Sequence, residues 1–155
     1  MNDSPVILGF IEDLISVVRI DNAAQESGFE FMHWEKPEDG DLVEASDSGP
    51  QGAEPLQGIE AALIEMISMR QPALVIFDLG NRSIPSQEWI ALITSVPATR
   101  GIPVLAFGPH VDKEKLDAAR EAGAKLSIAR SKFFKNLHGV LSENANVVDL
   151  AELLE

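Results

Sequence analysis

Short apolar runs alternate along this chain with segments whose apolar residues recur at helical spacing. The run from Ala73 to Phe77 contains no polar residue and ends at Asp78, and a second apolar run extends from Ile102 to Phe107. Runs of this length and composition are typical of strands that are buried on both faces of a parallel sheet. We therefore predict two central strands, the first of which carries Asp78 at its end.

Three weaker runs predict the remaining strands, over Val6–Ile11, Phe29–Trp34 and Leu126–Ala129. The second of these runs is rich in aromatic residues, which favour strands. The third contains the polar residue Ser127, which indicates a position at the edge of the sheet. Together with the two central runs they predict five strands.

Helical periodicity follows residue 58 and also follows the first predicted strand. After residue 58 the apolar residues have the spacing of an amphipathic helix that packs on a core and is closed by Pro72; they are Ile59, Ala62, Leu63, Met66 and Ile67. A second helix should follow Glu12 and Asp13 and stop at Gly28, because glycine is a frequent helix end. Its predicted core-facing residues are Leu14, Val17, Val18 and Ala24.

Three more helices are predicted in the second half of the chain. One begins near Ser83, a candidate cap, and Pro85, and it ends at Pro97. The others cover Lys113–Ala122, with Asp112 as cap and Gly123 as end, and about Ser131–Leu141. In the first of the three, Trp89 has the spacing of a core residue.

Strands that alternate with helices predict an α/β fold with three layers, in which helices cover both faces of a five-stranded parallel sheet. In such sheets ligands collect at the carboxyl edge, where Asp78 should lie. We divide the chain into a domain of residues 1–145 and an acidic, amphipathic C-terminal tail of residues 146–155. Within the domain, residues 36–58 hold six acidic residues and one basic residue, and they predict an acidic flexible loop insertion, with disorder as the alternative.

Composition narrows the function classes. The formal net charge of −13 argues against nucleic acid and against an anionic membrane surface, both of which attract basic proteins. The absence of cysteine excludes disulfides, thiolate catalysis and cysteine-bound metals. No apolar run approaches the roughly 20 residues of a membrane span, and the N-terminus lacks the positive region of a signal peptide. We expect a cytoplasmic protein.

Enzyme chemistry has little support in the sequence. No phosphate-binding glycine loop follows the first strand, since Gly9 lies within the run, and no Gly-x-Ser-x-Gly motif supplies a nucleophile. The three histidines, His33, His110 and His138, lack the short spacing of metal ligands. We expect no enzymatic activity.

Three segments resemble a known family, the CheY-like receiver domains of two-component response regulators. Gly101–Phe107 resembles the fourth strand of that family, and Ala118–Ala124 resembles the end of its fourth helix. The segment from Pro72 to Leu79 resembles its third strand. The resemblance covers about residues 5–143 and implies a flavodoxin-like topology with strand order 2-1-3-4-5.

The resemblance also implies roles for individual residues. Asp78 stands at the phospho-acceptor position, and Mg²⁺ would be held by Asp78 with two acids after the first strand. Those acids are Glu12 and Asp13 if the alignment slips by one residue, whereas an ungapped count gives Ile11 and Glu12. A plainer interpretation of Glu12 and Asp13 is that they cap the following helix.

Other positions depart from the family. Gly108 replaces a Ser or Thr, Ser127 replaces an aromatic residue, and Arg130 replaces a Lys. Arginine keeps the positive charge but not the compact geometry of an ammonium. These changes indicate an atypical receiver, or pseudo-receiver, in which a standing Asp78–Arg130 ion pair is an alternative to phosphorylation of Asp78.

Two functions follow from this pattern. The first is a stand-alone receiver-like signalling module that acts through protein–protein contacts, with a histidine kinase or an output protein as partner and a homodimer as a further assembly. A basic aromatic surface around Phe133 and Phe134 would serve such contacts, although both rings are also suited to core packing. The alternative is a sensor of a small anion or polar ligand at the carboxyl edge of the sheet, bound by Arg130, His110 and the backbone amides around Gly108.

Overall fold

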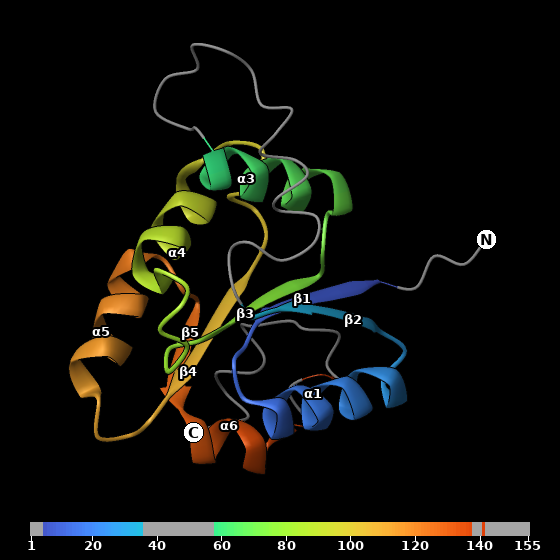
Figure 1. The fold of residues 1–155 in the computed structure, drawn as a ribbon, viewed down its shortest axis with the longest axis vertical. Helices are drawn as coiled ribbons and strands as arrows, with labels where there is room; N and C mark the ends of the chain where they lie inside the picture. The colour runs from blue at the N-terminus through green and yellow to red at the C-terminus, as the bar shows by residue number, and fades with distance from the viewer. Residues whose placement is uncertain (1–4, 36–57, 138–140, 142–155) are drawn as a thin grey trace.

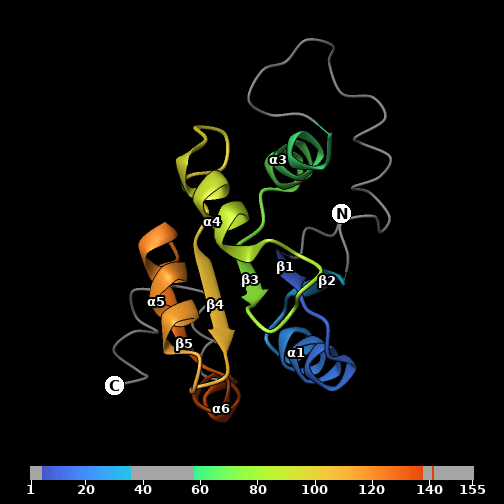
Figure 2. The ribbon, with the colours of Figure 1, turned by 60° about the vertical axis from the view of Figure 1, so that its left-hand side comes forward.

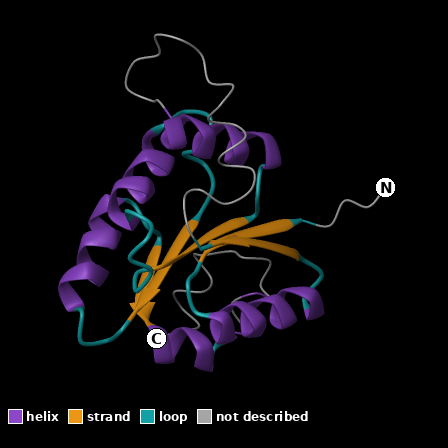
Figure 3. Cartoon of the chain, in the orientation of Figure 1, coloured by secondary structure: helices purple, strands orange, loops and turns teal. Residues whose placement is uncertain are grey.

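A computed structural model of the protein describes residues 5–35, 58–137 and 141. Five parallel strands form one sheet, as the sequence pattern predicted, in the order β2-β1-β3-β4-β5 that the family resemblance implied. Figure 1 and Figure 3 show this sheet between two layers of helices. The strands are β1 Val6–Phe10, β2 Glu30–Trp34, β3 Leu74–Asp78, β4 Val104–Gly108 and β5 Leu126–Ala129. The helices are α1 Leu14–Glu26, α3 Gly58–Arg70, α4 Ser86–Ser95, α5 Lys113–Ala122 and α6 Arg130–Lys135.

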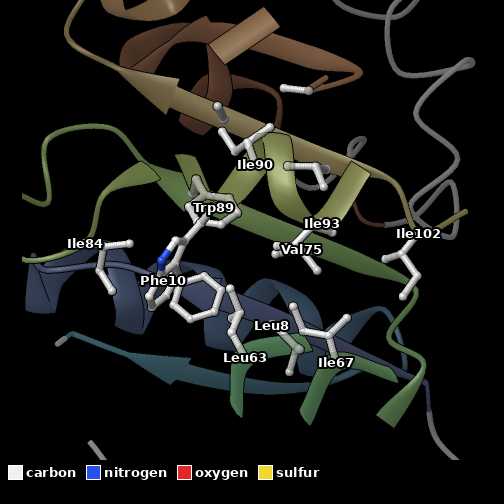
Figure 4. Close-up of a cluster of buried hydrophobic side chains, with 14 of the residues drawn as sticks. Leu8, Phe10, Leu63, Ile67, Val75, Ile84, Trp89, Ile90, Ile93 and Ile102 are labelled. Atoms are coloured by element: carbon white, nitrogen blue, oxygen red, sulfur yellow. The ribbon is translucent and has the colours of Figure 1, made fainter. Parts of the chain in front are cut away.

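Side-chain alternation along the strands divides the core into two halves. On one face, Leu8, Val75 and Val104 pack with residues of α3, α4 and α5. Figure 4 shows part of this half, where the edge of the Trp89 ring meets the ring of Phe10 at a centroid distance of 5.4 Å. Trp89 is therefore a core residue, which confirms the prediction from its spacing.

The opposite face of the sheet is covered by α1 and α6. Phe107 of β4 stacks on Phe133 with ring centroids 4.7 Å apart, and Phe134 meets both rings edge-on. Both phenylalanines of α6 are buried. The hypothesis that they form an exposed aromatic contact surface is therefore wrong, because the stacked rings close the core under this helix.

The buried face of α1 differs from the predicted one. Val17 and Ala24 are buried as expected, but Leu14 is 72% exposed and Val18 is 48% exposed. The packed stripe runs through Val17, Ile20 and Ala24, and Val18 is turned by about 100° from Val17. The first turns of α1 therefore present apolar side chains to solvent.

The bounds of α5 agree with the sequence, but the side chain of Asp112 at its N-cap makes no capping hydrogen bond, and the start of α4 differs from the prediction. Helix α5 spans Lys113–Ala122 as predicted, and Gly123 after it has φ +130°, where an added Cβ would overlap Thr94. Helix α4 begins at Ser86 without a side-chain cap. The predicted capping role of Ser83 is wrong, because Pro85 occupies the N-cap position, and Ser83 belongs to the preceding turn, where its N–H donates to the Asn81 side chain at 3.0 Å.

Some predictions fall outside the described residues. These are the structure of residues 36–57, of the tail 146–155 and of His138; Gly58, the last residue of the predicted loop, is the first residue of α3. In the described ranges, no helix has the length and apolar character that crossing a membrane requires.

Candidate functional site

Asp78 ends β3 and lies almost entirely out of contact with solvent, at 3% exposure. Because side chains alternate between the two faces of a sheet along a strand, the side chain of Asp78 lies on the same face as that of Ile76, toward α1 and α6. Figure 2 shows the carboxyl ends of β3 and β4 pointing toward these two helices. The carboxylate accepts a hydrogen bond from the Gly80 N–H at 2.9 Å. Burial nevertheless raises the pKa of Asp78, because the loss of hydration outweighs the stabilising Gly80 N–H and the nearby Arg130.

A cavity of about 420 Å³ lies at this edge of the sheet. Three carboxylates and one guanidinium line it, together with Gly80 and Pro109; they are Glu12, Asp13, Asp78 and Arg130. The structure thus brings together four residues that the sequence analysis had singled out from three separate segments. They meet because the carboxyl ends of parallel strands lie at one edge of the sheet.

Arg130, the first residue of α6, contacts two of these acids. Its Nη2 lies 2.7 Å from Asp13 Oδ2, and its Nη1 lies 3.8 Å from Asp78 Oδ1. The guanidinium carbon is 5.4 Å from the ring centre of Phe107 and 5.5 Å from that of Phe134. The closer ion pair is therefore with Asp13, and the partner expected from the sequence, Asp78, is at the limit of direct contact.

Asp13 also caps α1. Its carboxylate accepts hydrogen bonds from the N–H groups of Ile15 and Ser16, and from the Ser16 hydroxyl at 2.8 Å. The Ser16 hydroxyl lowers the pKa of Asp13 most, burial opposes it, and the two backbone N–H groups and Arg130 add to the lowering. Arg130 Nη2 donates to the Ser16 hydroxyl as well. The capping interpretation of Asp13 fits this geometry.

The arrangement does not fit a divalent metal ion. Among the residues that the structure describes, no three acidic, histidine or cysteine side chains are placed to hold one. Asp13 Oδ2 already accepts from Ser16 and from Arg130, and Asp78 Oδ1 accepts from Gly80. The cation beside Asp13 and Asp78 is the guanidinium of Arg130.

The other predicted anion-binding residues lie apart from this cavity. Gly108 ends β4, and a Cβ on it would come within 3.1 Å of the Leu79 Cβ, so a Ser or Thr side chain has little room here. His110 is exposed and is absent from the cavity lining. Sequence reasoning missed Ser16, Gly80 and Pro109. Only Ser16 gave a signal, since it stands three residues after Asp13, the spacing of a helix cap.

Ser127 occupies the position that the resemblance assigns to an aromatic residue. It is 2% exposed, and its hydroxyl donates to the Leu116 carbonyl at 2.6 Å. Its own carbonyl accepts from Arg120 Nη2 at 2.8 Å. Two hydrogen bonds therefore fix β5 to α5 at this point, at an edge strand as the sequence predicted.

A second cavity of about 650 Å³ lies between the beginnings of α4 and α5. Polar and charged groups line it beside Leu79 and Ile84, and they include Arg82, Ser86, Glu88, Glu114 and Lys115. The Ser86 hydroxyl is buried and has no hydrogen-bond partner in the described part of the chain. No ion pair of Arg82 or Lys115 is found there either.

A five-stranded parallel sheet in the order 2-1-3-4-5 with helices on both faces is the flavodoxin-like fold that receiver domains have. No family model and no curated protein matches the chain. Solved structures do. The chain is 16% identical to a response regulator from Thermotoga maritima, with a TM-score of 0.60 over 92% of this chain and 98% of that one.

Two further structures agree. A response regulator receiver domain from Clostridium thermocellum is 15% identical, with a TM-score of 0.63 over 97% of this chain and 99% of that one. The response regulator Rcp1, in its Mn(2+)-bound form, is 16% identical, with a TM-score of 0.62 over 92% and 95% of the two chains. The protein therefore has the receiver-domain fold, and at these identities the likeness establishes the fold alone.

Proposed function

We propose that this chain is a receiver-like signalling module that acts through protein–protein contacts and does not depend on phosphorylation of Asp78. The observation that carries the proposal is the Ser127 hydroxyl bonded to the Leu116 carbonyl at 2.6 Å. In the family that the chain resembles, an aromatic residue at this position reports the phosphorylated state. A buried, hydrogen-bonded serine has no comparable freedom to move.

The end of β4 supports the same conclusion. The resembling family places a hydroxyl there to contact the phosphoryl group, whereas Leu79 packs against Gly108 in this protein. A phosphoryl group on Asp78 would thus meet no hydroxyl from residue 108 and no aromatic reporter at residue 127. The module is non-enzymatic in this proposal, and a cytoplasmic location remains part of it.

Protein contacts are supported by the surface of α1 beside the cavity. Leu14, Ile15 and Val18 are 72%, 68% and 48% exposed. Exposed apolar side chains that form a contiguous patch mark protein interaction sites. A histidine kinase, an output protein or a second copy of the chain are the partners that fit this role.

The test is a comparison of amide NMR spectra before and after addition of beryllofluoride with Mg²⁺. We expect no shifts in β5 and α5 of the wild-type chain, and the same result in Asp78→Asn. Shifts at Ser127 and Leu116 that are lost in Asp78→Asn would overturn the proposal, because they would show a working phosphorylation switch.

The second cavity favours a second candidate function, the sensing of a small polar ligand at the carboxyl edge of the sheet. Arg82, Lys115 and the buried Ser86 hydroxyl lack partners in the described residues and line one space. The rim around Arg130 suits an anion less well, because three carboxylates line it. A thermal-shift screen of phosphate and dicarboxylates should raise the melting temperature of the wild type but not of Arg82→Ala/Lys115→Ala. An equal rise in both would exclude this cavity as the site.

A further inference from the structure

The acidic cavity contains its own cation. We infer that Arg130 takes the place of a divalent ion in this cavity, so that the chain binds divalent cations there only when Arg130 is removed. The inference concerns the cavity beside Asp78 and rests on the proposed function, in which this cavity is not a working phosphorylation site. The inference adds that the Arg130 guanidinium, and not a metal ion, is the cation that this cavity holds.

The first support is the position of the guanidinium. It reaches both Asp13, at 2.7 Å, and Asp78, at 3.8 Å, and Glu12 lines the same cavity. A cation that bridges these carboxylates must occupy the space between them. Arg130 enters that space from the side of α6, and a metal ion would have to displace it.

The second support is that Arg130 is held in place. Its Nη2 donates to Asp13 and to the Ser16 hydroxyl, and Ser16 is itself 2% exposed. The ring centres of Phe107 and Phe134 lie 5.4 and 5.5 Å from the guanidinium carbon, within the range of a cation–π contact. As the first residue of α6, directly after β5, Arg130 has its backbone fixed by two elements. An arginine held in this way is preorganised for its carboxylate partners.

The third support is that the oxygens a metal would need are in use. Asp13 Oδ2 accepts from the Ser16 N–H at 3.3 Å, from the Ser16 hydroxyl at 2.8 Å and from Arg130. Arginine does not lose its proton at accessible pH, so the competition persists at every pH at which the acids are ionised. Although no three acidic side chains of the described residues are placed to hold a metal ion, removal of the arginine charge leaves the three carboxylates that line the cavity without a compensating cation, and we expect their oxygens to attract a hard divalent cation.

The experiment titrates Mn²⁺ alone into the full chain, with free Mn²⁺ measured by electron paramagnetic resonance. Arg130→Gln, which keeps hydrogen-bonding groups without the charge, should bind Mn²⁺ at least about tenfold more tightly than the wild type. Arg130→Gln/Asp78→Asn should lose that gain. Arg19→Ala is the matched control, because Arg19 also lies over Phe134 but does not line the cavity; its affinity should equal that of the wild type.

Equal Mn²⁺ affinity in the wild type and Arg130→Gln would overturn the inference, as would a gain that survives Asp78→Asn. If Arg130→Gln fails to fold by circular dichroism, Arg130→Lys replaces it. Its shorter ammonium should give an affinity between those of the wild type and an uncharged residue, and an unchanged affinity would again overturn the inference. No phosphodonor is present, so a failure here is distinguishable from a failure of the proposed function, which the beryllofluoride spectra decide.

Discussion

Arg130 and Asp13 stand 117 positions apart in the chain, yet Nη2 of one lies 2.7 Å from Oδ2 of the other. The same Asp13 carboxylate caps the start of α1, because it accepts hydrogen bonds from the N–H groups of Ile15 and Ser16. One side chain therefore both caps a helix and anchors the cation of the acidic cavity. The first turn of α1 and the first residue of α6 are joined through it.

These two roles of Asp13 can be separated by two substitutions. Asp13→Ala removes the cap and the ion pair, and we expect a loss of about 1–2 kcal/mol in the free energy of unfolding. Asp13→Asn keeps a capping oxygen and loses only the charge, so we expect a loss below about 1 kcal/mol, because both partners of the ion pair are partly exposed. Urea unfolding measures both values. Equal losses would mean that the cap contributes nothing.

The two carboxylates should give opposite pH dependence. Burial raises the pKa of Asp78, so the folded state holds its proton more tightly than the unfolded state does, and stability falls as pH rises through the raised pKa. Asp78→Asn removes this penalty. Relative to the wild type, the variant should gain stability as pH rises above the unfolded pKa of about 3.9, measured by urea unfolding at each pH. A difference that is constant with pH would contradict this.

Asp13 supplies the control for that experiment. Hydrogen bonds from Ser16 and Ile15 and the charge of Arg130 lower the pKa of Asp13. Its ionised form therefore adds stability above the unfolded pKa of about 3.9, and this stability is lost as pH falls through the lower folded value. The loss caused by Asp13→Asn should be largest near neutral pH and should shrink in acid. The slope has the opposite sign to that of Asp78→Asn.

Restoring a hydroxyl at the end of β4 should strain the fold. A Cβ on Gly108 would lie 3.1 Å from the Leu79 Cβ, so we expect Gly108→Ser to cost about 1–2 kcal/mol in stability. Leu79→Ala alone should cost about 2 kcal/mol because Leu79 is buried. The double variant should lose less than the sum of the two, because Leu79→Ala keeps the Cβ of residue 79 but removes its Cδ1 and Cγ, which would lie 3.6 and 3.7 Å from the added Cβ. Strict additivity in chemical denaturation would exclude the contact.

The hydrogen bond of Ser127 should contribute to stability because it is buried. Ser127→Ala leaves the Leu116 carbonyl without this donor, and we expect a loss of about 1–2 kcal/mol in thermal unfolding. Ser95→Ala is the matched control, since the Ser95 hydroxyl also donates to a carbonyl, that of Leu92, but at an exposed position. Its effect should stay within about 0.5 kcal/mol. If both substitutions lowered the stability by similar amounts, the Ser127 hydrogen bond would not be what fixes β5 to α5.

Local patterns predicted most of the fold. The apolar run that ends at Asp78 and the bounds of α5 agree with the structure because buried strands and glycine-ended helices leave strong local signals. The burial of α1 was predicted less well, since Leu14 and Val18 are as apolar as the residues that are buried. Which side of a helix meets the sheet is decided by packing, and the spacing alone left both choices open.

The sequence by itself determined the order of elements, the parallel sheet and the delivery of Asp78 to its carboxyl edge, because periodicity and chain order suffice for these. Only the tertiary structure decided that Arg130 is closer to Asp13 than to Asp78 and that Leu79 fills the space beside Gly108. Contacts between side chains from distant segments depend on how whole elements pack. Differences of about an ångström in the distances between side chains then decide which of two chemically equivalent carboxylates Arg130 pairs with.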